Sequence, residues 1–244
     1  MIGTLLNVAG IVIGGVAGLL KISGTSPARE STIKIILGAF TVFYGLRLTW
    51  ISAAENGTVS HALKLLGIAI LSLMLGKLIG QLLGLQKGSN RIGQMAKEIF
   101  AAPVPRNERP WSHGFRACAG LFCAAPLGIL GAVSDGLSEY YSPLAIKGVI
   151  DGLATLGIVS ILGWSPILSA LPVLVVQGSI TLLIRYHALP FLVAHHLVAP
   201  INTTAGLLVF AVALVILQLK KLALADYLPS LLVAAGLGWF WNQP

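Results

Sequence analysis

Charged side chains are scarce in this sequence. Asp, Glu, Lys and Arg make up 10% of the 244 residues, hydrophobic residues make up 56%, and the mean hydropathy is +0.89. A soluble chain of this length has a large polar surface, which so few charged residues cannot cover. At least six apolar stretches reach the roughly 20 residues needed to cross a hydrocarbon core of about 30 Å. The composition predicts a polytopic membrane protein.

Catalytic and nucleotide-binding motifs are also missing. The sequence contains no phosphate loop, dinucleotide fingerprint, nucleophile elbow or HExxH motif. Its two cysteines, Cys118 and Cys123, lie five residues apart in one apolar stretch, so on a helix they face different directions and suit neither a disulfide nor a metal site. We therefore expect no enzymatic activity, no nucleic-acid partner and no cofactor, although a bound Na⁺ or another cation is compatible with the sequence.

Hydropathy predicts an all-α transmembrane bundle of eight helices, with seven as the alternative, in a single membrane domain over residues 1–244. The predicted spans are 2–20, 33–52, 62–83, 115–133, 143–162, 166–184, 204–219 and 223–241. Residues 186–201 form a stretch too short and too broken to cross comfortably, interrupted by Pro190, Pro200, His195 and His196. We predict a re-entrant or interfacial segment there, because irregular backbone at membrane depth must be sheltered by protein or water.

Basic residues are concentrated in three connections. The formal charge of +8 comes mainly from residues 21–34, 87–109 and 220–221. The positive-inside rule places these connections in the cytoplasm and both termini outside. Residues 86–113 combine a helical pattern of alternating polar and apolar residues with three prolines, which predicts a cytoplasmic amphipathic helix followed by a linker over 101–110. This segment suits an electrostatic anchor to anionic lipid or, as the less favoured alternative, a docking site for a soluble partner.

Small residues recur at helical spacing in the first and third predicted spans. One stripe contains Gly10, Gly14 and Gly18, another contains Gly76, Gly80 and Gly84, and Gly148 and Gly152 thin one face of the fifth span. Such faces let membrane helices approach closely. We expect a homo-oligomer, most simply a dimer, with at least one stripe in the contact.

Two segments resemble each other, which hints at an inverted repeat. Residues 38–46 and 206–214 both begin with Gly and end with Leu, and in the predicted topology their helices run in opposite directions. Inverted repeats underlie many secondary transporters. Gly and Leu are so common in this sequence that chance is the simpler explanation.

Three charged residues lie within or at the end of apolar segments. Lys147 and Asp151 are four residues apart in the fifth span, and Asp135 ends the fourth. Charge at membrane depth is costly and usually functional. Lys147, Asp151 and Thr155 share one helix face, which predicts an ion pair. The alternative is a pair that only fixes helix packing, with Asp135 as a solvated helix end.

Neutral polar groups could complete a cation or proton site around Asp151. Hard cations such as Na⁺ require oxygen ligands, which Asn7, Gln177 and Thr181 could supply. Lys147 would then compete with the ion for the Asp151 carboxylate, which gives a physical basis for coupling. Each neutral residue is more often an interhelical hydrogen-bond partner than a ligand.

Several motifs, in order, resemble a known family. They begin with Gly3-Thr-Leu-Leu-Asn7 and continue with Asp135-Gly-Leu, Lys147-Gly-Val-Ile-Asp151-Gly, the Leu168–Val173 segment and Gln177-Gly. Together they resemble the domain of unknown function 554 family, the YqgA/YdfK-like bacterial inner-membrane proteins, over nearly the whole chain. The resemblance implies a multi-pass protein of the bacterial cytoplasmic membrane, usually described as a transporter without an assigned substrate.

We therefore expect a secondary transporter or channel-like carrier of a small ion. Cations or protons are favoured, because buried carboxylates outnumber buried bases that cannot snorkel. A non-transporting scaffold or accessory subunit is the alternative. An anion or organic-acid carrier is weaker, because Asp151 would already neutralise Lys147. A water-filled cavity reaching Asp151 would favour transport, and a dry, fully paired site would favour the scaffold.

Overall fold

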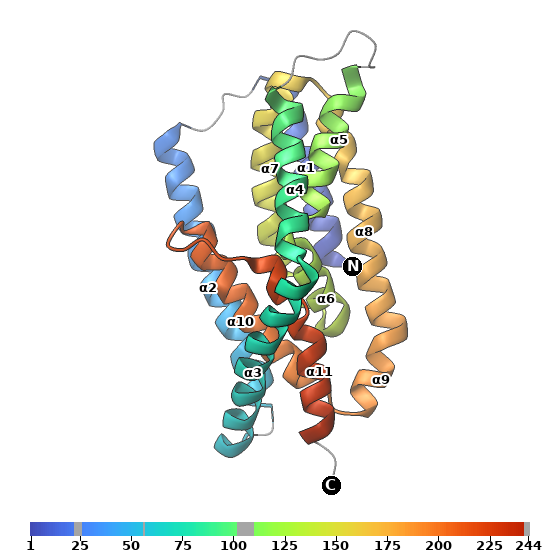
Figure 1. The fold of residues 1–244 in the computed structure, drawn as a ribbon. Coiled ribbons are helices and arrows are strands. Elements are labelled where there is room, and N and C mark those ends of the chain that lie inside the picture. Colours follow the sequence, from blue (N-terminus) through green and yellow to red (C-terminus); the bar gives the residue numbers. More distant parts are fainter. Residues whose placement is uncertain (22–25, 56, 102–109, 242–244) are drawn as a thin grey trace. The chain divides into compact units, whose positions relative to one another are not determined.

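The computed structural model describes residues 1–21, 26–55, 57–101 and 110–241 (Figure 1). Its elements are α1 (Ile2–Leu19), α2 (Pro27–Ala53), α3 (Val59–Leu83), α4 (Leu85–Ala101), α5 (Pro110–Cys123), α6 (Pro126–Ser138), α7 (Ser142–Leu162), η1 (Ser165–Ser169), α8 (Ala170–Leu183), η2 (Ile184–Ala188), α9 (Leu189–Ala194), α10 (Val198–Ile216), η3 (Leu224–Tyr227) and α11 (Ser230–Trp241). In this part of the chain there is no strand, and seven helices are long and apolar enough to cross a membrane, or eight if α5 and α6 form one broken span. The predicted all-α transmembrane bundle is confirmed.

The helices form two compact units. The first contains residues 1–30, 87–135 and 139–181, and the second contains residues 31–86, 136–138 and 182–244. Each unit is described by itself below. The single membrane domain predicted over residues 1–244 stays a prediction, and most of the predicted linker over 101–110 lies outside the described residues.

In the first unit, α1 and α7 run parallel and touch through their glycines. A Cβ added to Gly152 would lie 2.6 Å from the carbonyl oxygen of Gly10, and one added to Gly148 would lie 2.8 Å from that of Leu6. Further along, a Cβ on Gly18 would lie 2.7 Å from the carbonyl oxygen of Leu156. Side chains would force these backbones apart, so the glycines permit the contact.

In the second unit, the glycines of α3 face the C-terminal segment. A Cβ on Gly80 would lie 2.5 Å from the Cα of Asp226, and Gly76 meets Ser230 in the same way. Gly84 ends α3 in the left-handed region, with φ of 65°. Both stripes therefore pack against other segments of the same chain. The homodimer, with a stripe in its contact, stays a prediction.

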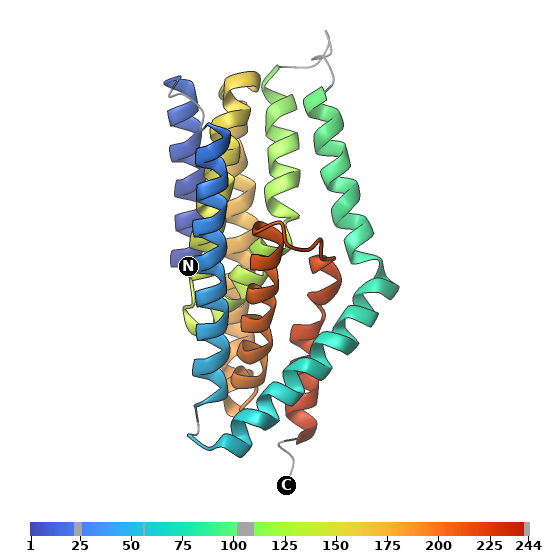
Figure 2. The same cartoon turned by 90° about the vertical axis from the view of Figure 1, so that its left-hand side faces the viewer.

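The helices α1, α2 and α3 pack antiparallel to α8, α10 and α11, respectively. In the second unit, Gly45 and Thr49 of α2 approach Gly206 and the Thr203 carbonyl of α10, so sequence numbers rise along one helix as they fall along the other (Figure 2). The same order holds for α3 and α11.

In the first unit, α1 is antiparallel to η1 and α8. Ile11 packs in one cluster with Ala170 and Val173, and Gly15 faces Ile167. The predicted opposite directions of residues 38–46 and 206–214 agree with the packing of α2 and α10.

The predicted span 115–133 is broken in the structure. Residues 112–123 of α5 and α6 meet at an angle of 58°, with Ala124 and Ala125 between them. Pro126 begins α6, where its missing N–H would have no partner in the helix anyway. The interruption thus lies between α5 and α6.

Residues 186–194 continue the helix of α8, so the predicted re-entrant break does not occur there, and an interfacial position stays a prediction. A π-helical turn, η2, links α8 to α9, and the three together with η1 make one apolar stretch from Ser165 to Ala194. Proline lacks the N–H that an α-helix would use and crowds the preceding turn. The wider π turn immediately before Leu189 and Pro190 accommodates it, so this proline does not end the helix.

The polar connection contains the predicted amphipathic helix, α4. Its residues Ile92 and Phe100 face α5 and the adjoining hydrophobic cluster, and Ala96 on the same face is buried. Met95 is 55% exposed. The predicted helix is confirmed, and its place on the cytoplasmic surface stays a prediction.

Candidate functional site

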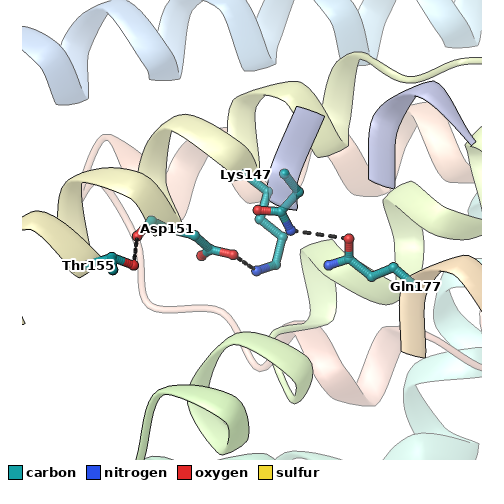
Figure 3. Close-up of polar contacts among 5 residues, drawn as sticks. Lys147, Asp151, Thr155 and Gln177 are labelled. Carbon is teal, nitrogen blue, oxygen red and sulfur yellow. Dashed lines mark hydrogen bonds and ion pairs between the residues drawn. The ribbon is translucent and has the colours of Figure 1, made fainter. Parts of the chain in front are cut away.

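Lys147, Asp151 and Thr155 lie on one face of α7, as predicted (Figure 3). The Lys147 ammonium donates a hydrogen bond to Asp151 Oδ2 within an ion pair. The Thr155 hydroxyl donates to the Asp151 backbone carbonyl at 2.7 Å. Lys147 is 2% exposed and Asp151 5%. Asp151 lies beside the midpoint of this 21-residue apolar helix, so the pair is buried in the protein at the middle of a candidate membrane span.

Two amides from other helices join this pair. Asn7 of α1 donates from Nδ2 to Gln177 Oε1 of α8 at 3.1 Å, and both side chains are buried. Their remaining atoms, Asn7 Oδ1 and Gln177 Nε2, have no hydrogen-bond partner in the described protein. A buried polar group without a partner costs about 1–3 kcal/mol. The site therefore offers one acceptor and one donor that a bound species can use.

The break between α5 and α6 lies against the same residues. The ring of Phe122, in the last turn of α5, has its centroid 5.7 Å from Lys147 Nζ. In the first turn of α6, a Cβ on Gly128 would lie 3.0 Å from both Lys147 Cε and Gln177 Nε2. Larger side chains at position 128 would displace these groups. The ends of two half-helices thus flank the buried pair.

The ends of α5 and α6 at the break bear partial charges of opposite sign. The last carbonyls of α5 bear partial negative charge, and the first N–H groups of α6 bear partial positive charge. Transporters use discontinuous helices in this way, with N-termini toward anionic groups and C-termini toward cations. The arrangement around Lys147 and Asp151 can therefore interact with ions of either sign.

Two predicted site residues lie elsewhere in the first unit. Asp135 Oδ2 accepts a hydrogen bond from the Gly3 N–H at 3.1 Å and lies 2.9 Å from the Met1 amino nitrogen. A carboxylate at a helix N-terminus is stabilised by the helix dipole. Asp135 is 2% exposed, so the alternative of a solvated helix end was wrong. Thr181 donates to the Ala132 carbonyl of α6 at 3.1 Å.

Sequence reasoning missed several residues of this region. Phe122 and Gly128 looked like ordinary apolar and small residues, although Pro126 between them was a signal that the helix breaks there. In the second unit, Asp226 was also missed. Its Oδ1 accepts the Gln86 N–H at 2.8 Å, and Gln86 Oε1 accepts the Ala225 N–H at 3.0 Å, so this acid fixes the start of α4.

Comparison with known proteins gives a consistent family assignment. The family described as "Protein of unknown function (DUF554)" matches residues 2–239. The chain is similar to "Uncharacterized protein YqgA" of Escherichia coli (strain K12), with 28% identity over 99% of this chain and 98% of the relative. It is also similar to "Uncharacterized membrane protein YdfK" of Bacillus subtilis (strain 168), with 27% identity over 96% of this chain and 93% of the relative. No solved structure matches. With its apolar helices, the chain is a multi-pass membrane protein that belongs to the DUF554 family.

Proposed function

We propose that this protein is a secondary carrier or channel-like carrier of a small ion, coupled to a proton or another cation at Asp151, and not an enzyme. One observation carries the proposal: the ion pair of Lys147 and Asp151 is buried beside the broken α5–α6 helix, between amides with unpartnered atoms. We assign it to the bacterial cytoplasmic membrane, supported by its bacterial relatives and its apolar helices.

The environment of the pair favours function over packing alone. Desolvating two charges opposes folding, and well-packed apolar residues often replace a buried ion pair at no loss of stability. A break in a helix at membrane depth also leaves backbone groups that need protein or water. Finding both features together, with Asn7 and Gln177 incompletely bonded, supports a site that exchanges partners.

The proposed coupling is a competition for one carboxylate. A proton or cation that occupies Asp151 weakens its attraction for Lys147, and departure of that ion restores the pair. The two occupancy states differ in local charge, which is what a conformational equilibrium needs in order to respond to an ion. Asn7 Oδ1 and the hydroxyl oxygen of Thr155 are neutral oxygens that could assist a bound cation.

The antiparallel helix pairs support an inverted repeat as part of this proposal. The number of residues from Gly10 of α1 to Gly178 of α8 equals the number from Gly38 of α2 to Gly206 of α10. Equal separations are what a repeat predicts if α1 and α2 correspond to α8 and α10. Asn7 and Gln177 join α1 to α8, so the site lies where the first pair meets. Binding sites of inverted-repeat transporters lie at the junction of the repeats.

Flux into proteoliposomes tests the proposal. A panel of monovalent and divalent cations is measured with and without a pH gradient, and Asp151→Asn is expected to abolish coupled flux because it removes the charge while preserving shape. Asp226→Asn is the matched control, since it makes the same change at a buried acid that holds α4. Wild-type flux from Asp151→Asn at matched thermal stability would overturn the assignment.

A double replacement separates carriage from packing. Lys147→Met combined with Asp151→Leu should fold, because it leaves no buried unpaired charge, but it should not carry the ion. Lys147→Ala alone leaves the Asp151 charge without its partner and should destabilise by about 3–5 kcal/mol. A double variant with wild-type flux would assign the pair to packing and favour a membrane scaffold or accessory subunit.

A further inference from the structure

A pocket of about 400 Å³ opens beside the α5–α6 break in the first unit. The residues of its lining used below are Ser89, Asn90, Gln94 and Lys97 of α4, and Ala124 and Ala125 of the break. Its walls are thus a mixed face of α4, which also contributes Ile92, and on the other side Leu121 of α5 with the irregular backbone of the break. The polar groups of the α4 face do not suit contact with lipid tails.

The composition of the lining indicates a water-filled pocket. A lysine, two amides and a hydroxyl from one helix would be costly to expose to hydrocarbon. The backbone between Cys123 and Pro126 lacks regular helical hydrogen bonding and also needs water or protein as a partner. The pocket supplies that contact where the helix is interrupted.

The floor of the pocket is close to the buried pair. Ala125 lines the pocket, and Gly128 lies three residues further, on the same side of the first turn of α6. Gly128 in turn contacts the Lys147 side chain and the unpartnered Gln177 Nε2. About one helical turn, roughly 5 Å, therefore separates Ala125 of the pocket from Gly128, which lies against Lys147.

Most of the charged groups along this path are positive, although the last carbonyls of α5 at the same break bear partial negative charge. Lys97 is the charged residue of the lining, which contains no Asp or Glu. The first turn of α6 adds the partial positive charge of a helix N-terminus. Gln177 Nε2 and the Lys147 ammonium follow at the inner end. These groups favour an anion, and the last carbonyls of α5 and the Asp151 carboxylate oppose it.

We propose that this pocket admits a small anion, such as a short carboxylate, to Lys147 when Asp151 is protonated. This inference rests on the proposed function and names its substrate class. Protonation neutralises the Asp151 carboxylate, and Lys147 stays an ammonium that pairs with the anion. The anion and the proton move together, so no net charge remains buried. Gly128 lies between Ala125 of the pocket and Lys147, and a Cβ there would lie 3.0 Å from Lys147 Cε, so the anion reaches Lys147 only if this side chain moves.

Thiol reactivity tests the charge preference of the pocket without requiring transport. In a full-length background with Cys118→Ala and Cys123→Ala, Ala125→Cys places one thiol at the pocket floor. Its modification rates with anionic sulfonatoethyl and cationic trimethylammonioethyl methanethiosulfonate are compared. Ala124→Cys is the second reporter, in case the first variant does not fold.

The anionic reagent is expected to react faster relative to its rate with a free thiol. Lys97→Gln should lower the anionic-to-cationic ratio about fivefold, as expected for unit charges roughly 8 Å apart in water. Lys87→Gln, the same change on α4 outside the lining, should leave the ratio unchanged. Equal ratios in the Ala125→Cys protein, its Lys97→Gln variant and its Lys87→Gln variant would overturn the inference. The absence of a reaction with either reagent would also overturn it.

The outcome is separable from that of the proposed function. Succinate-driven proton uptake into proteoliposomes should require Asp151 and should fall with Gly128→Val, whose side chain would press on Lys147 and Gln177. Loss of coupled cation flux in Asp151→Asn, with no charge preference at the pocket, would leave the proposed function standing and refute the anion. If the pocket thiol prefers the anionic reagent but proton uptake does not depend on succinate, succinate-like anions are refuted as the substrate.

Discussion

Replacing Gly152 by alanine tests the contact that holds α7 against α1. The new Cβ would lie 2.6 Å from the Gly10 carbonyl oxygen and 3.1 Å from its carbonyl carbon. Backbone cannot move aside as a flexible side chain can, so the helices must separate. Overpacking of this kind costs about 1–3 kcal/mol. Gly152 adjoins Asp151, so the separation should also disturb the ion pair.

Gly157→Ala is the matched control on the same helix. Nothing lies within 4 Å of a Cβ at this position. Alanine favours the helix over glycine by up to about 1 kcal/mol in both variants, and this gain cancels in the comparison. The difference between the two free energies of unfolding should therefore equal the overpacking term of about 1–3 kcal/mol.

Thermal unfolding in detergent measures the difference. For a chain of this size, 1 kcal/mol shifts Tm by roughly 2–4 °C, so Gly152→Ala should melt several degrees below Gly157→Ala. Equal melting temperatures would refute the close approach of α1 and α7 and, with it, the placement of Asn7 near the ion pair.

Two further predictions concern the second unit and the topology. Asp226→Ala removes the acceptor of a backbone N–H at the start of α4 and should destabilise by about 1–3 kcal/mol, measured by thermal unfolding; an unchanged Tm would mean that this bond does not hold the helix. With both native cysteines replaced by alanine, Glu55→Cys and Lys87→Cys should react with a membrane-impermeant reagent from opposite sides, because the 25-residue α3 lies between them. Labelling from the same side would show that α3 does not cross.

Most helix positions could be predicted because hydropathy is a local property of the chain. The interruptions were harder. Pro126 lies among apolar residues, so the hydropathy of 115–133 shows no gap although the helix breaks there. Pro190 is the opposite case: the sequence predicts a break there, but the helix continues through a π turn. Whether a proline interrupts a membrane helix depends on the hydrogen bonds of the neighbouring turn, which composition does not reveal.

The candidate site could be predicted in part. Lys147 and Asp151 stand out because charge within an apolar segment is costly, and their spacing on one helix fixes their contact. The contributions of Asn7 and Gln177 depend on which helices are neighbours, and local sequence does not determine that. For the same reason, Asp135 could not be recognised as the acid that binds the start of α1.

The parallel contact of α1 with α7 affects how the protein is made. The first helix is synthesised more than a hundred residues before the helix that covers its glycine face. At roughly 5–20 residues per second, α1 waits for several seconds in the membrane. During that interval its Asn7 amide and bare backbone must face lipid, the translocation machinery or a temporary neighbour. The earliest part of the chain to enter the bilayer is thus among the last to reach its final surroundings.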